Sequence, residues 1–217
     1  MAQPRAAQIL QPLNPFYKRE AKVALLFITD PANFAPPTGT RADFVDWKRY
    51  PDSVPFDFNG QLEFKDLTDV TRLGFGLFIK NGHLTRRSQD GGPSWDGSFS
   101  AGNALLFTDF TPGPLHISFD GPIRGASMQL NIKDPVSHFR IGISAFAGTK
   151  KLPVPKSGTR TDGVFSNAGD GSAAWLGVLE DNPNRPALTR IVLSVTVLDS
   201  GYVGDSSFAI NKLNLVV

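Results

Sequence analysis

The stretch Pro114–Asp120, PLHISFD, shows the pattern that decides the fold. Its apolar residues, Leu115, Ile117 and Phe119, alternate with polar ones. Successive side chains of an extended chain point to opposite faces, so this alternation predicts a β-strand with one face against a core and the other toward solvent. A helix would instead repeat its apolar residues at every third or fourth position.

The same alternation recurs on both sides of this stretch. It is found in residues 55–65, 72–80, 126–133, 137–148 and 188–198. Shorter apolar runs occupy residues 23–28, 103–110 and 173–180, and a further strand closes the chain. Turn-forming sequences such as Asn81-Gly82 and Asp120-Gly121-Pro122 separate these segments. The sequence therefore predicts about ten strands.

The composition points to the same fold class. The chain has 21 glycines and 17 prolines, whereas glutamate occurs only as Glu20, Glu63 and Glu180. Glycine and proline favour turns and glutamate favours helices, so many short strands joined by tight turns are expected. We predict an all-β fold, an antiparallel two-sheet sandwich with a jelly-roll-like strand order.

One or two short helical turns complete the expected structure. Asp30 can cap such a turn, with Pro31 at its first position, and a second turn or a strand can form within residues 41–50. Residues 1–22 are rich in proline, glutamine and alanine and lack periodicity, so we expect a partly flexible N-terminal arm. Residues 23–217 are expected to form a single β-sandwich domain.

The closing stretch Ser206–Val217, SSFAINKLNLVV, changes the phase of its alternation. Phe208 and Ile210 share one register, and Leu213 and Leu215 share the other. A β-bulge inserts one extra residue and so reverses which side chains face the core. We therefore predict a bulge near Asn211-Lys212 and burial of both apolar pairs.

Charge and composition argue against several classes of protein. The formal net charge is +2 with lysine and arginine scattered, which does not favour nucleic-acid binding. The chain has no cysteine, so it has neither a disulfide nor a thiolate zinc site. No apolar run approaches the roughly 18 to 20 residues that span a bilayer. The start MAQPRAAQILQP lacks the apolar stretch of an export signal. Two interpretations fit equally well: a signal was removed, or none existed.

Several motifs together resemble a group of exported bacterial proteins. They are SWDGSFSAGNALLFTD (94–109), GPLHISFDGPIRGASMQL (113–130), GDGSAAWLGVLED (169–181) and SSFAINKLNLV (206–216). In order and spacing they are similar to proteins of the PEP-CTERM-associated type. The resemblance implies secretion and a jelly-roll or carbohydrate-module-like sandwich, and it supplies no catalytic residues. Two features depart from the group: the sorting tail is missing, and Ser207 stands where relatives often have an acidic residue.

The sequence offers little support for catalysis. The three histidines, His83, His116 and His138, are far apart, so a surface role is favoured over a metal or base site. No Gly-x-Ser-x-Gly motif occurs. Asp57 and Glu63 share a strand face but are six residues and about 20 Å apart, too far to act together in glycoside hydrolysis. An enzyme is therefore less favoured than a binding protein.

Two kinds of binding site are predicted instead. Calcium requires several oxygen ligands, and Asp43, Asp46 and Asp205 could supply them if the first and last strands are neighbours. No other cofactor is expected.

Aromatic side chains are the usual platform for sugar rings. Trp47, Tyr50 and Tyr202 lie in loop-like surroundings and are the predicted ligand-binding residues, although simple packing is slightly favoured over ligand binding for Trp47. Trp95 and Trp175 are interpreted as packing residues.

These observations favour a secreted, non-catalytic β-sandwich that binds carbohydrate or another extracellular-matrix component. One alternative is a polysaccharide hydrolase or lyase on the same scaffold, and another is a purely structural surface protein. A groove with exposed aromatic rings and no converging acids would favour the first function. A pair of acids within catalytic distance would favour the hydrolase or lyase.

Overall fold

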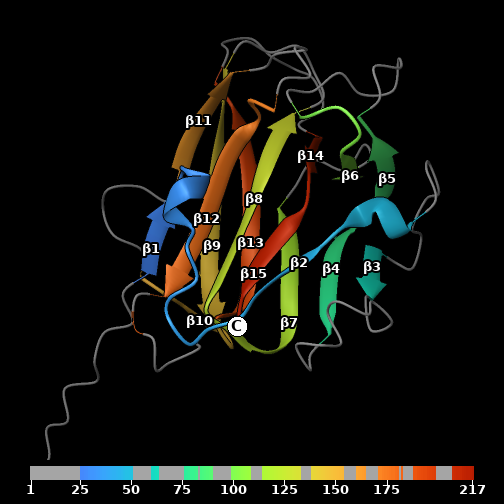
Figure 1. The fold of residues 1–217 in the computed structure, drawn as a ribbon. Coiled ribbons are helices and arrows are strands. Elements are labelled where there is room, and N and C mark those ends of the chain that lie inside the picture. The colour runs from blue at the N-terminus through green and yellow to red at the C-terminus, as the bar shows by residue number, and fades with distance from the viewer. Residues whose placement is uncertain are drawn as a thin grey trace, which may run out of the picture.

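The computed structural model describes two antiparallel sheets packed face to face, one of 8 strands and one of 7 (Figure 1). The described residues are 25–50, 60–63, 76–82, 84–89, 99–108, 114–132, 138–153, 160–164, 171–180, 182, 188–198 and 207–217. The predicted all-β sandwich is confirmed. The predicted arm at 1–22 and the apolar side chains of Phe56 and Phe58 lie outside the described residues.

The strands are distributed between the two sheets as follows. The eight-stranded sheet holds β1 (Leu25–Ile28), β2 (Ala42–Val45), β5 (Thr85–Ser88), β6 (Ala104–Phe107), β8 (Gly125–Ile132), β12 (Ala174–Glu180), β14 (Phe208–Ile210) and β15 (Leu213–Val216). The seven-stranded sheet holds β3 (Gly60–Glu63), β4 (Leu77–Gly82), β7 (Leu115–Ile123), β9 (His138–Ala147), β10 (Lys150–Lys151), β11 (Arg160–Val164) and β13 (Leu188–Val197). The strands outnumber the predicted ten for two reasons. The last predicted strand divides into β14 and β15, and β2, β5, β10 and β11 are too short to show a clear alternation in the sequence.

The strand order is that of a jelly roll. One sheet contains the order β12-β8-β14-β6, and the other contains β7-β13-β9 with β11 beside β9. Between β6 and β14 the chain passes back and forth between the sheets, which is the double Greek key of this architecture. Of the remaining strands, β15 follows β14 along β8 and pairs with β2 on its other side, and the others lie toward the ends of the two sheets. Figure 1 shows the resulting two layers.

The main core lies between the two sheets. Leu115 and Ile117 of β7 and Ile191 and Leu193 of β13 are all 0% exposed, as their alternation predicts. The same alternation predicts that Val195 and Val197 face the core, but both are only partly buried. The reason is that β7 pairs with β13 only as far as Leu193, so Val195 has a neighbouring strand on one side alone.

The closing strand contains the predicted bulge. Ile210 pairs with Leu130, and Asn214 pairs with Ser127, so four steps along the closing strand match three steps along β8. Lys212 is the extra residue in this stretch. The bulge turns Leu213 and Leu215 inward, where they are buried together with the two apolar residues of β14. The prediction that both apolar pairs are buried is confirmed.

Asn211 holds the bulge in place. Its backbone N donates to the Gln129 carbonyl (3.2 Å), while its side-chain Oδ1 accepts from the Gln129 backbone N (2.9 Å). Its Nδ2 donates to Gln129 Oε1 (2.6 Å). The Asn211 side chain thus takes the place of the Asn211 backbone carbonyl as the acceptor for the Gln129 backbone N. The Asn211 carbonyl is left to accept from Trp47 Nε1 at 2.7 Å.

Both short helical turns also form. In η1 (Pro31–Asn33) the Asp30 side chain accepts from the backbone N of Ala32, and Pro31 occupies the first position, as predicted. In η2 (Trp47–Arg49) Asp46 plays the same capping role. None of the helices in the described part of the chain has the length and apolarity needed to cross a bilayer.

Candidate functional site

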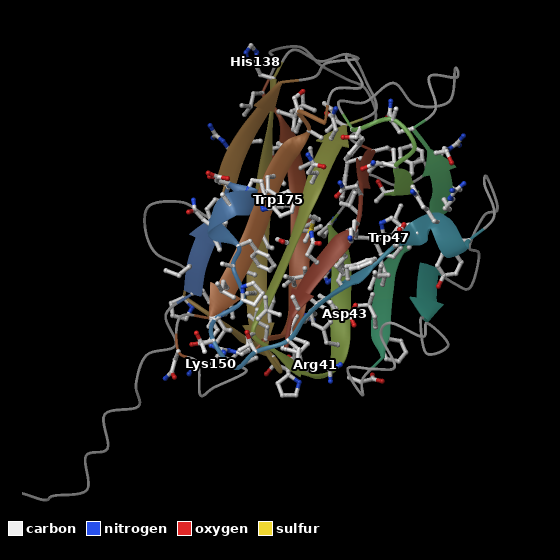
Figure 2. The ribbon with its side chains drawn as sticks, in the orientation of Figure 1. Arg41, Asp43, Trp47, His138, Lys150 and Trp175 are labelled. Carbon is white, nitrogen blue, oxygen red and sulfur yellow. The ribbon has the colours of Figure 1, made fainter. Side chains whose placement is uncertain are left out.

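A groove lies on the outer face of the eight-stranded sheet, between η1 with its following loop and strand β2. Its volume is about 520 Å³. Figure 2 shows Trp175 beside η1, Arg41 just before β2 and Asp43 within it. The residues that line the groove are Pro31, Phe34, Pro36, Arg41, Ala42, Asp43, Phe44, Trp175, Asn214 and Leu215.

Strand β12 places Trp175 at the groove. Leu176 points into the core and is 0% exposed, so Trp175 points to the outer face, where it is half-buried. Gly177 is the next residue of β12 on that face. A Cβ atom there would lie 2.7 Å from the Ser127 Cβ, so the sheet at this point has no room for a side chain. Position 177 of β12 therefore presents backbone alone beside the indole.

Phe34 forms the wall on the η1 side. It packs against the small apolar cluster of Ile28, Leu179 and Val216 on the outer face of the sheet. A Cβ on Gly125 would lie 3.3 Å from Phe34 Cε2, which shows how closely the phenyl ring lies on β8. The capped turn of η1 thus fixes an aromatic ring against the sheet.

Strand β2 forms the opposite wall. Phe44 pairs in register with Asn214 of β15, and the Lys212 Nζ lies 3.2 Å from the centre of the Phe44 ring. Arg41 is exposed, and its backbone exchanges two hydrogen bonds with Val217, each 2.9 Å. Since both ends of β2 are held to β15, this wall is attached to the sheet along its length.

Charged groups in the groove do not form a catalytic pair. Asp43 is the one carboxylate among the described residues that line the groove, and its Oδ1 accepts from the backbone N of Phe44 at 2.8 Å. Hydrolysis of a glycosidic bond normally requires two carboxyl groups about 5 to 9.5 Å apart. Within the described lining, Asp43 has no second carboxyl group with which to form such a pair.

The structure corrects the interpretation of Trp47. Its ring is 0% exposed in the main core, and its Nε1 donates to the Asn211 carbonyl, so it cannot stack on a ligand. Tyr50 is half-buried and packs against the same core. Tyr202 lies outside the described residues. Trp47 therefore serves packing, although the turn that carries it looks like a surface loop in the sequence, and the ligand-binding role of Tyr50 stays a prediction.

Two of the three predicted calcium ligands, Asp43 and Asp46, lie among the described residues. Strands β2 and β15 are neighbours, as the prediction required. Asp43 lines the groove, but Asp46 accepts from the backbone N of Lys48 (3.1 Å) as the cap of η2. Asp205 lies outside the described residues. Within the described residues, no three His, Cys, Asp or Glu side chains are grouped so that they could hold a metal ion.

Sequence reasoning missed the three aromatic residues of the groove, Phe34, Phe44 and Trp175. A signal existed for Trp175, because it alternates with the apolar residues Ala174 and Leu176 and so falls on the outer face of its strand. No comparable signal existed for Phe34, whose position depends on how η1 lies across the sheet.

Comparisons with known proteins add little. No family model and no curated protein matches the chain. Among solved structures, the K2 cleaved adhesin domain of Lys-gingipain is similar, with a TM-score of 0.28 and 10% sequence identity over 82% of this chain and 100% of that domain. A similarity this low carries no argument about fold or function.

Proposed function

We propose that this protein is a secreted, non-catalytic β-sandwich that binds carbohydrate, or another hydroxyl-rich component of the extracellular matrix, in this groove. The observation that carries the proposal is the half-buried ring of Trp175 in a groove shared with Phe34 and Phe44. Aromatic rings offer flat apolar faces for sugar rings, and a few polar groups nearby fix the orientation of the ligand.

The indole nitrogen of Trp175 supports the same proposal. Its Nε1 is buried and has no hydrogen-bond partner among the described residues. Leaving a buried donor unsatisfied costs about 1–3 kcal/mol. A ligand hydroxyl that accepts from Nε1, after a small adjustment of the side chain, would remove this cost. Binding would thus gain a hydrogen bond that the described residues leave unmade.

The polar lining suits hydroxyl groups. The Arg41 guanidinium supplies donors, the Asp43 carboxylate supplies acceptors, and the Asn214 amide supplies both. The volume of about 520 Å³ lies within the range of about 300–1,000 Å³ that is usual for small-molecule sites. We infer that the groove accepts one end or a short internal segment of an oligosaccharide.

The test is a glycan-array screen of the wild-type protein and the Trp175→Ala and Phe34→Ala variants, with a reducing-sugar assay on the same glycans. Leu26→Ala is the matched control, because Leu26 is 46% exposed on β1 and does not line the groove. We expect the wild type and the control to bind the same glycans, and each groove variant to lose affinity about tenfold or more.

The other outcomes overturn the proposal. Release of reducing sugar by the wild type would favour the hydrolase alternative. Binding that survives in both groove variants would place the site elsewhere, and an absence of both binding and turnover would favour a structural surface protein. Circular dichroism of each variant checks that the fold is intact.

Secretion and kinship with the PEP-CTERM-associated group are part of the proposal and rest on the motif resemblance alone. Fractionation of the source cells with an antibody against the protein tests the first of these. We expect the protein in the medium or at the cell surface. Its recovery in the cytoplasm would remove both inferences.

A further inference from the structure

A second surface of interest is the outer face of the seven-stranded sheet, on the side of the sandwich opposite the groove. Two rows of residues cross four neighbouring strands there, each row in register. None of their side chains is buried. We call them the outer strip; one row is Lys80, His116, Val192 and Ser144, and the other is Phe78, Ser118, Arg190 and Phe146.

Arg190 lies near the centre of the outer strip. Its guanidinium carbon lies 4.2 Å from the centre of the Phe146 ring, so the side chain is stacked against the sheet. Its Nε is buried without a hydrogen-bond partner among the described residues. A guanidinium that is already oriented by stacking loses little entropy when it binds a carboxylate with two parallel hydrogen bonds.

The outer strip itself contains no acidic residue, and the acids around it lie at its margins. Asp120 follows on the same face of β7, where its Oδ2 accepts from the backbone N of Gly76 at 3.2 Å. Glu63 pairs in register with Phe78 at one side, and Asp162 pairs with Arg140 farther along β9. The positive charges of Lys80 on β4 and Arg190 on β13 therefore lie on either side of β7, and the part of β7 within the outer strip carries no acid.

His116 reports the electrostatic potential of this surface. Its pKa lies below the ordinary value of 6.5, first because the ring is partly desolvated and then because the positive charges of Arg190 and Lys80 oppose its protonation. Lys80 pairs with it directly from β4. Both cations are thus close enough to His116 to oppose a further positive charge at that point of the strip.

We propose that the outer strip binds a polysaccharide that carries carboxylate groups. Arg190 and Lys80 would pair with the carboxylates, and the phenyl rings of Phe78 and Phe146 would contact the apolar faces of the sugars. These two rings stand three strand spacings apart, about 14 Å, which matches an extended ligand lying across the strands. A nucleic acid fits less well, because the formal net charge of the chain is only +2.

The experiment is an NMR titration of the His116 ring protons with oligogalacturonate, with a neutral dextran oligosaccharide and a single-stranded oligonucleotide in parallel. We expect oligogalacturonate to raise the pKa of His116, because bound carboxylates offset the nearby cations. Added salt should weaken this binding. Arg190→Gln should weaken it about tenfold, whereas Lys150→Gln, which removes an exposed charge on β10, should not.

Trp175→Ala separates this inference from the proposed function. The variant should bind oligogalacturonate at the outer strip like the wild type, whatever happens at the groove. The inference is overturned if oligogalacturonate leaves the His116 resonances unchanged, or if Lys150→Gln weakens binding as much as Arg190→Gln. Tighter binding of the oligonucleotide than of oligogalacturonate would also overturn it.

Discussion

At the scale of single residues, Asn211 joins three parts of the chain through Gln129, Asn103 and Trp47. It is 7% exposed, and truncation would leave the Gln129 N–H without its acceptor. We expect Asn211→Ala to lower the free energy of unfolding by about 2 kcal/mol. Urea unfolding measures this. Asn214→Ala, which loses one hydrogen bond of 3.3 Å, should cost clearly less, and equal losses would contradict the account.

Trp47 and Trp175 should respond differently to the same substitution. Trp47→Phe removes a buried hydrogen bond of 2.7 Å and leaves the Asn211 carbonyl unsatisfied, so it should destabilise the protein by about 1–3 kcal/mol. Trp175→Phe removes an indole N–H that is buried without a hydrogen bond to the described residues, and its desolvation cost with it, so the unfolding midpoint should not fall. A larger loss of stability in Trp175→Phe than in Trp47→Phe would contradict the roles assigned to the two tryptophans.

His116 predicts a pH dependence of stability. Its pKa is lowered in the folded protein, by burial first and then by Arg190 and Lys80. The unfolded chain therefore binds the proton more readily as the pH falls from about 6.5, and stability is lost as the pH drops through the folded pKa. His116→Gln lacks this contribution. Between about pH 7.5 and about pH 5, the wild type should lose more stability than the variant, and parallel losses would refute the assignment.

At the scale of elements, the bulge explains why the closing strand changes phase. Lys212 is the extra residue, so deleting it keeps Leu213 and Leu215 inward and should cost little more than its contact with the Phe44 ring, about 1 kcal/mol. Deleting Asn214 instead turns Leu215 outward and should prevent folding. Circular dichroism and thermal unfolding compare the two deletions, and equal damage would argue against the bulge.

Gly177 sets how closely β12 and β8 approach beneath the groove. An added Cβ would lie 2.7 Å from the Ser127 Cβ and 3.1 Å from the Ala126 carbonyl oxygen. Gly177→Ala should therefore destabilise the protein by about 1–3 kcal/mol. The double variant with Ser127→Gly should recover part of that loss, because it removes the nearest atom. If the double variant shows no recovery in urea unfolding, the contact is not the cause.

At the scale of the whole molecule, the alternation in PLHISFD and its counterparts was enough to predict two stacked sheets, and the phase change before Leu213 was enough to predict the bulge. The site was harder to predict. Trp47 lies in a polar, loop-like segment, yet its partner Asn211 is 164 residues away along the chain. The alternation of residues within one segment cannot reveal a contact with a distant segment. For the same reason it cannot reveal that η1 places Phe34 opposite Phe44.

The two proposed sites lie on opposite outer faces of the sandwich. The groove lies on the outer face of the eight-stranded sheet, and the outer strip lies on that of the seven-stranded sheet. If both proposals hold, one molecule could hold two polysaccharide chains on opposite sides of the sandwich. The two sites share no residue, so variants of each can be tested separately.

The most direct test of the central claim follows the indole N–H resonances of the three tryptophans in ¹⁵N-labelled protein during titration with a glycan selected by the array. We predict that the Trp175 resonance moves with ligand concentration, while the resonance of Trp47, bonded to the Asn211 carbonyl in the core, stays in place. A Trp175 resonance that remains fixed while the glycan binds would contradict the account.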